Sequence, residues 1–313
     1  MKVIKEFLNY SKNIDANSYA NQVHVESELI LNKIINQKNI VNFRNNHLSY
    51  YSGALSHPDQ FPGYWFSRGI LRNYFSSLRF LISKKKKLKN FIKKQNLKFY
   101  DMEENNIGNP IIYKFLFFKE TGTNITNCFY YSLFKKYFDL VKPKKIVEIG
   151  GGFGKLGSII LDKNPGIKYS LIELPSTSLT SFYYLSEFCK LKNLEDISFF
   201  FDTRSEFNQK KVSIITSAYL NNKKDEKMLN DCDLLINTES FMHMSENEIA
   251  FYINLIKKNK IRYILCINRL EKKREGETEF SKLFNDENIK LVEKIDLDTV
   301  LESMYLTFYE NFN

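Results

Sequence analysis

Residues 145–157 read Lys-Ile-Val-Glu-Ile-Gly-Gly-Gly-Phe-Gly-Lys-Leu-Gly, an apolar run that leads straight into a glycine cluster. The run has the length and composition of a buried strand, and the apolar residues that follow recur at helical spacing. Glycines at such a turn let the chain bend sharply and let a ligand approach bare backbone where the helix begins. The stretch therefore predicts a strand, a ligand-binding loop and a helix.

The spacing of apolar residues differs on the two sides of Pro143. Before it, residues 1–140 are predicted to be mostly helical, with a polar hinge at 104–110 and an aromatic-rich helix after it. Helical spacing of apolar residues is clear around 23–35 and 70–81, and prolines and a glycine predict a loop at 57–63. We therefore expect a helical N-terminal region, 1–140, that binds substrate or forms a lid.

After Pro143, short apolar strands alternate with helices. Helices are predicted at about 176–191 and 246–259, and strands at 168–172, 212–216, 233–237 and 263–267, with a closing pair at 290–295 and 304–309. Residues 197–202 compete with 212–216 for the third strand of the sheet. Such alternation is typical of parallel β-α units. Residues 141–313 are thus predicted to be an α/β domain with a Rossmann-like, doubly wound sheet.

Charge is also unevenly distributed. Of the formal net charge of +10, residues 1–140 hold 21 Lys and Arg against 10 Asp and Glu, whereas residues 141–313 hold 25 against 26. Much of the excess lies between Lys84 and Lys98. This asymmetry predicts either a solvated helix face or contact with an anion, such as a phosphorylated substrate, an acidic glycan or a membrane surface. A basic module that binds nucleic acid or membranes without catalysis remains an alternative.

Several classes of protein are disfavoured by composition. No stretch reaches 18 apolar residues, and Lys5 and Glu6 interrupt any apolar core of a secretory signal. The four cysteines are isolated, so a disulfide framework or a zinc finger is not expected, and a cytoplasmic location fits best.

Two acidic residues bear on what the glycine loop binds. Gly152 to Gly157 satisfies the dinucleotide pattern G-x-G-x-x-G, and Glu173 follows at a distance suited to ribose hydroxyls, so an NAD-dependent oxidoreductase is one alternative. Glu148, however, ends the strand just before the loop, where it would repel a pyrophosphate. It suits a cation such as S-adenosylmethionine, since at ~4 Å and an effective dielectric of ~20 the Coulomb energy is roughly 4 kcal/mol before desolvation.

The stretch from Val147 to Gly157 resembles the first motif of class I S-adenosylmethionine-dependent methyltransferases. Glu173 is similar to the acidic residue that this family places after its second strand. The resemblance implies a class I methyltransferase fold with S-adenosyl-L-methionine as cofactor. The residues expected to bind it are Glu148, Gly150, Gly152, Phe153, Gly154, Glu173, Leu174, Asn237 and Thr238.

Three segments are similar to a bacterial group of sugar O-methyltransferases: 106–110, 148–154 and 233–244. The resemblance implies methyl transfer to a sugar hydroxyl of a glycan or a nucleotide-sugar precursor. The fourth-strand motif of that group has a Glu where this chain has His243, so the identity of the general base is left open between His243 and Glu239.

The hinge supplies two candidate substrate residues, Asn109 and Tyr113, because a segment directly before a catalytic fold often covers its site. No metal site is predicted, nucleic acid is not an expected partner, and the oligomeric state is left open.

Overall fold

The computed structural model describes residues 39–44, 70–194, 197–201, 210–217, 219–220, 229–271, 278–279, 284 and 288–312. The helical spacing at 23–35 and the loop at 57–63 lie outside these described residues. Within them, no helix combines the length and the apolar character needed to cross a bilayer.

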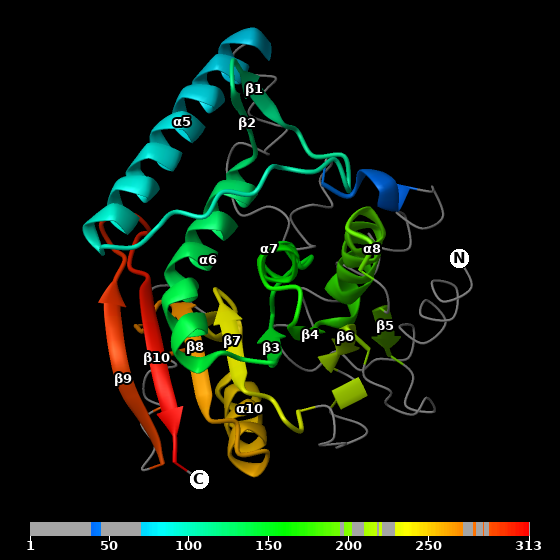
Figure 1. The fold of residues 1–313 in the computed structure, drawn as a ribbon, viewed down its shortest axis with the longest axis vertical. Helices are drawn as coiled ribbons and strands as arrows, with labels where there is room; N and C mark the ends of the chain where they lie inside the picture. Colours follow the sequence, from blue (N-terminus) through cyan, green and yellow to red (C-terminus); the bar gives the residue numbers. More distant parts are fainter. Residues whose placement is uncertain are drawn as a thin grey trace.

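An eight-stranded sheet forms the centre of the molecule (Figure 1). Its strands follow the order β5-β6-β4-β3-β7-β8-β10-β9. Within the described sheet β10 alone runs in the opposite direction to the other seven strands. This arrangement confirms the predicted Rossmann-like, doubly wound sheet. The strand bounds are β3 Lys145–Ile149, β4 Lys168–Glu173, β5 Ile197–Phe200, β6 Val212–Thr216, β7 Leu234–Thr238, β8 Tyr263–Asn268, β9 Ile289–Asp296 and β10 Tyr305–Asn311.

The two segments that competed for the third strand are both strands. β6 pairs directly with β4, and β5 adds to the free side of β6 as the edge strand. The closing pair is confirmed as an antiparallel hairpin, with β10 inserted between β8 and β9.

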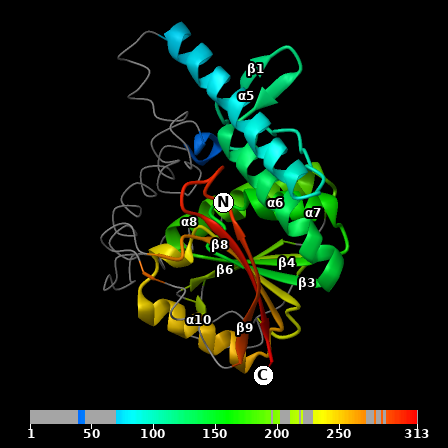
Figure 2. The ribbon, with the colours of Figure 1, turned by 90° about the vertical axis from the view of Figure 1, so that its left-hand side faces the viewer.

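Helices cover both faces of the sheet because its side chains alternate between two cores. Ile146 belongs to the core that includes α6 (Gly122–Val141), α7 (Lys155–Lys163) and α8 (Pro175–Leu191). Val147 packs in the other core, against α10 (Glu246–Lys258). Figure 2 shows α10 on the opposite side of the sheet from α6 and α7. Glu148 is two residues after Ile146 in the strand, so its side chain points to the same face of the sheet, the side of α7.

In the N-terminal region, helix α5 (Ile70–Lys94) packs on α6 through buried leucines such as Leu78 and Leu81. The chain then returns to a short hairpin, β1 (Tyr113–Phe115) and β2 (Phe118–Glu120), where the sequence had predicted helix. The helix begins later because the side chain of Thr121 caps α6, accepting from the Asn124 N–H at 3.0 Å.

Helix α6 belongs to the layer that covers the sheet, although it precedes the predicted domain boundary at 140. It packs against α7. Near its end, the ring of Tyr137 lies 4.6 Å from that of Phe308 on β10. The N-terminal region is thus joined to the sheet through a shared core.

Candidate functional site

The loop between β3 and α7 crosses the carboxyl edge of the sheet in a conformation that requires glycine. Gly150, Gly152 and Gly154 have φ of 69°, 62° and 91°. A Cβ on Gly150 would lie 1.9 Å from Ser240 Oγ, and one on Gly154 would lie 2.8 Å from Leu185 Cδ1. The glycines therefore let the loop pack closely against Ser240 and Leu185 at the start of α7, at the edge of the sheet where ligands of open α/β folds bind.

The side chain of Glu148 is fully buried directly beneath this loop. Its Oε2 accepts a hydrogen bond from Tyr169, and its Oε1 accepts one from Thr238 at 3.4 Å. A Cβ on Gly151 would lie 2.5 Å from the Glu148 carboxyl carbon. Burial raises the pKa of Glu148 to about 7, although both hydrogen bonds act in the opposite direction.

Glu173 ends β4, the strand next to β3, and its carboxylate turns back onto the glycine loop. Oε1 accepts from the Gly152 N–H at 2.5 Å, and Oε2 accepts from the Leu174 N–H at 2.9 Å. Burial raises the pKa of Glu173 to about 8, and the nearby charge of Glu148 adds to this increase. The structure thus brings together two buried carboxyl groups at the ends of adjacent strands.

Asn237 ties the end of β7 to its surroundings. Its Nδ2 donates to the Ile149 carbonyl at 2.8 Å, and its Oδ1 accepts from the Phe241 N–H at 3.0 Å and from Asn268 Nδ2 at 2.8 Å. The residue is fully buried. These bonds hold the loop after β7 in place. A direct contact of Asn237 with a ligand remains a prediction, as does one of Thr238, which is half-buried.

Glu239 lies just beyond β7 with a φ of 56°, and its backbone N–H donates to the Ile267 carbonyl at 2.7 Å. The carboxylate is half-buried and accepts a hydrogen bond from the hydroxyl of Tyr130 on α6. Tyr130 is itself buried, and burial followed by the charge of Glu239 raises its pKa well above its usual value, so the phenol keeps its proton. Sequence reasoning missed this pairing.

His243 ends the short 3₁₀ helix η4 (Phe241–His243) and is exposed. Because Glu239 lies before this helix in a left-handed conformation, the two residues do not share one helical face. A catalytic role of either residue stays a prediction.

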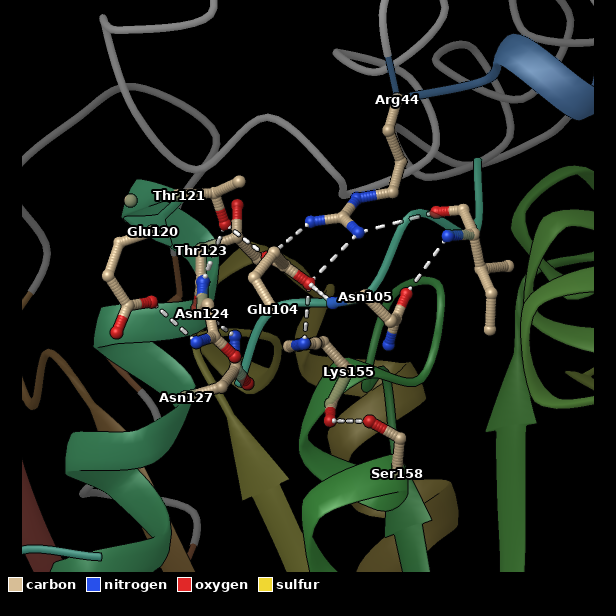
Figure 3. Close-up of polar contacts among 12 residues, drawn as sticks. Arg44, Glu104, Asn105, Glu120, Thr121, Thr123, Asn124, Asn127, Lys155 and Ser158 are labelled. Carbon is tan, nitrogen blue, oxygen red and sulfur yellow. Dashed lines mark hydrogen bonds and ion pairs between the residues drawn. The ribbon is translucent and has the colours of Figure 1, made fainter. Parts of the chain in front are cut away.

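A buried ionic cluster that sequence reasoning missed lies beside the glycine loop (Figure 3). It joins Arg44, which follows η1 (Asn39–Asn42), Glu104 of the hinge and Lys155, the first residue of α7. Arg44 Nη2 lies 2.9 Å from Glu104 Oε2, and Lys155 Nζ lies 2.8 Å from Oε1. All three side chains are at most 2% exposed. The cluster anchors the residue that directly follows Gly154.

Two cations against one carboxylate give this cluster a net positive charge. Burial alone would raise the pKa of Glu104, but the charges of Arg44 and Lys155 outweigh it and hold that pKa well below its usual range. For Lys155, burial alone would lower the pKa, but the charges of Glu104 and Tyr184 together with the hydrogen bond to Glu104 raise it. No spacing in the sequence links these positions, because they come from three distant segments.

The remaining predicted residues lie in different surroundings. Phe153 is buried in the core, with its ring 4.7 Å from that of Tyr184 and the Arg44 guanidinium 5.0 Å above it. Tyr113 is buried in β1, its ring 5.2 Å from that of Tyr74. Asn109 is exposed and donates to Asn42 Oδ1 at 3.0 Å. Their contacts with ligand or substrate remain predictions.

A cavity of about 1110 Å³ lies along the hinge rather than at the glycine loop. Asn109 lines it, together with residues from the C-terminal ends of α7 and α8, such as Lys163 and Lys192. These helix ends lie at the amino edge of the sheet, away from Glu148 and Glu173. Within the described part of the chain, no three His, Cys, Asp or Glu side chains gather as a metal site would require.

Comparisons with known proteins find similarity in structure alone. No protein-family model and no curated protein sequence matches the chain. Similar solved structures include the mitomycin 7-O-methyltransferase MmcR (14% identity, 60% of this chain and 57% of that one, TM-score 0.39) and the pyocyanin biosynthetic protein PhzM (12%, 60% and 56%, 0.41). A third is human N-acetylserotonin methyltransferase in complex with SAM (14%, 60% and 56%, 0.35).

The similar region spans just over half the length of each of these three proteins. At such low identities and TM-scores, the fold is established by the strand order and the glycine loop of this structure itself.

Proposed function

We propose that this chain is an S-adenosylmethionine-dependent O-methyltransferase that acts on a sugar hydroxyl. The observation that carries the proposal is the buried Glu148 carboxyl beneath the glycine loop. Among the described residues its hydrogen bonds come from the neutral groups of Tyr169 and Thr238, so no cation compensates its charge. A cationic ligand supplies that compensation, whereas a dinucleotide pyrophosphate would add repulsion.

The groups around the loop fit the donor chemically. The positive-φ glycines turn the chain sharply, so that backbone N–H groups lie at the start of α7. Glu173 offers carboxylate oxygens as acceptors for ribose hydroxyls, in place of its present bonds to the Gly152 and Leu174 N–H groups. When bound, the donor supplies a methyl group on a positively charged sulfur, which leaves as a neutral thioether.

For the transfer itself, the chain must align the acceptor hydroxyl with that methyl group and remove the hydroxyl proton. Alignment alone contributes several kcal/mol. Glu239 stands at the carboxyl edge of the sheet as a candidate base, oriented by the Tyr130 hydroxyl. His243, four residues further on, is the second candidate, and either would typically accelerate transfer by ~10²–10⁴-fold.

A polar face of α6 reaches the candidate base Glu239. Thr123, Asn127 and Tyr130 follow one another at i, i+4 and i+7, which places them on one side of the helix, and Tyr130 reaches Glu239. The resemblance of three segments to sugar O-methyltransferases supports a sugar as the acceptor.

Calorimetric titration with S-adenosylmethionine and, separately, with NAD tests the proposed cofactor. We expect binding of the methyl donor and none of NAD. Glu148→Gln should weaken the donor at least tenfold, and Glu246→Gln, an exposed carboxylate on α10, should leave it unchanged. Binding of NAD without any heat from the donor would overturn the proposal.

Transfer of labelled methyl groups to a panel of sugars, nucleotide sugars and extracted glycans tests the base. If Glu239 takes the proton, Glu239→Gln should lower turnover by ~10²–10⁴-fold with donor affinity unchanged, and Tyr130→Phe should lower it less. If His243 does so, His243→Ala should give the large loss instead. Labelling of non-sugar acceptors alone would reject the sugar assignment.

A further inference from the structure

Helix α5 presents a strongly basic outer face. Its 25 residues include nine Lys or Arg and no Asp or Glu. The inner side, with Leu78, Leu81 and Leu88, is buried against the rest of the molecule. In Figures 1 and 2, α5 lies at the periphery, beyond α6 from the sheet. The helix is therefore amphipathic, with an apolar side that packs and a cationic side that faces outward.

Part of this charge is neutralised within the molecule. Lys85 lies 2.8 Å from Asp101 and also pairs with Glu120, and Lys89 lies 2.8 Å from the other oxygen of Asp101. Five further basic side chains are exposed and have no ion-pair partner in the described part of the chain: Arg79, Lys86, Lys87, Lys93 and Lys94. The outer face thus keeps an uncompensated positive charge.

The tip of the β1–β2 hairpin exposes three consecutive apolar residues beside the N-terminal end of α5. Phe115, Leu116 and Phe117 are 51%, 84% and 105% exposed. The hairpin is fixed to α5 because the Tyr74 hydroxyl donates to the Lys114 carbonyl at 3.1 Å and accepts from its N–H at 2.8 Å. A contiguous apolar patch of this kind on a protein surface marks an interaction site.

We propose that the outer face of α5 and this hairpin tip form a docking surface for an anionic lipid bilayer. The apolar tip enters the boundary between headgroups and acyl chains, and the unpaired basic side chains contact the lipid phosphates. Buried apolar area and electrostatic attraction to anionic lipid both strengthen interfacial binding, so the two features together should bind more tightly than either alone. None of these surface residues is a predicted cofactor or catalytic residue, although Tyr113, a candidate substrate residue, lies in the same hairpin.

Lipid is favoured over other anionic or apolar partners by the combination of the two features. A nucleic acid would pair with the lysines, but it would leave Leu116 and Phe117 in water. A symmetric contact with a second copy would bury the tips, but it would bring two cationic helices toward each other. A bilayer with anionic headgroups offers phosphates to the basic side chains and an apolar interior to the hairpin tip.

Co-sedimentation of the full chain with phosphatidylcholine vesicles, with and without 30% phosphatidylserine, tests the proposal. We expect at least tenfold tighter binding to the anionic vesicles. Leu116→Ser/Phe117→Ser and, separately, Lys86→Gln/Lys93→Gln should each weaken it at least fivefold. Lys144→Gln/Lys168→Gln, which removes the same charge from exposed positions at the amino edge of the sheet, should change it less than twofold.

All of the substituted side chains are exposed, so each variant should fold, and matched melting temperatures check this. A change in vesicle binding can then be assigned to the surface itself. Equal binding to neutral and anionic vesicles, or an equal loss in the Lys144/Lys168 control, would refute the lysine contribution. Unchanged binding of the tip variant would refute insertion. Binding to RNA without binding to vesicles, or a tip-dependent dimer in size-exclusion chromatography, would replace the lipid with another partner.

Discussion

The carboxyl group of Glu148 links the proposed site to pH. Its pKa of about 7 means that much of it is protonated below neutrality, because burial disfavours the charged form. A cationic ligand binds the ionised form, so binding must release a proton at mildly acidic pH. The group therefore predicts a pH dependence that an exposed carboxylate would not give.

We expect the affinity for S-adenosylmethionine to rise about tenfold between pH 6 and pH 8, since ionisation of one group with this pKa gives roughly that change. Calorimetry in two buffers of different ionisation enthalpy measures the released proton directly. In Glu148→Gln both the proton release and the pH dependence should shrink, with any remainder assigned to Glu173. A wild-type affinity that does not change over this range would contradict the role assigned to Glu148.

At the scale of the element, the β3–α7 loop depends on glycine at particular positions. Gly150 combines a φ of 69° with a space already filled by Ser240, whereas Gly166, in the turn after α7, has nothing within 4 Å of an added Cβ. Gly150→Ala should lower the free energy of unfolding by about 1–3 kcal/mol or more. Gly166→Ala should be neutral or stabilising by about 0.4–1 kcal/mol. Urea unfolding measures both, and equal effects would show that the loop tolerates a side chain.

The ionic cluster that joins η1, the hinge and α7 predicts an asymmetry between two substitutions. Glu104→Gln leaves Arg44 and Lys155 buried without a counter-charge and should cost about 3–5 kcal/mol. Lys155→Met keeps the Arg44–Glu104 pair intact and should cost less, about 1.5–3 kcal/mol, the contribution of a hydrogen bond to a charged group.

The measurement for this pair is again urea unfolding at neutral pH. If Lys155→Met lowered the free energy of unfolding more than Glu104→Gln does, the counter-charge of Glu104 would not be the main stabilising contribution in the cluster. Donor affinity provides a second readout, because Lys155 directly follows Gly154. We expect Lys155→Met to weaken the donor more than its smaller effect on stability would explain.

For the molecule as a whole, the part of the fold that follows local pattern was predictable. Local sequence marks the strand at 145–149, its glycine loop and the alternating strands and helices after it. The marks are short apolar runs with regular spacing, separated by glycine, proline and polar residues. The β1–β2 hairpin was missed because a turn at Leu116, with a φ of 52°, carries no glycine or proline to mark it.

The site was predictable only in part, for a physical reason. Glu148 and Glu173 are marked by their position at strand ends, which local sequence reveals. The tyrosines that pair with the acids of the site are not marked: Tyr169 donates to Glu148, 21 residues away along the chain, and Tyr130 donates to Glu239, 109 residues away. Contacts of that kind depend on how the helices and strands pack against one another. The residue pattern of a single segment carries no information about this packing.

The same buried acids set how the stability of the whole chain depends on pH. In the unfolded chain Glu148 and Glu173 ionise near 4.5, and in the folded chain near 7 and 8. Between these values the native state binds more protons, so the free energy of unfolding falls as pH rises. Their contribution to the free energy of unfolding is fully present below pH 4.5. It is lost as the pH rises from 4.5 through the folded pKa values of about 7 and 8. Glu104 acts in the opposite sense, because its lowered pKa gives a contribution that is lost as the pH falls below 4.5.

We therefore expect the ligand-free protein to be most stable near pH 5 and less stable at pH 8, by on the order of several kcal/mol, since one pKa unit corresponds to about 1.4 kcal/mol. Urea unfolding at pH 5, 6.5 and 8 measures the slope. Glu148→Gln/Glu173→Gln should flatten it, because neither amide titrates, and a saturating cationic ligand should flatten it as well by favouring the ionised carboxylates. A stability that rises up to pH 8 in the ligand-free protein would mean that both acids are ionised in the fold, and that the charge beneath the glycine loop is already compensated.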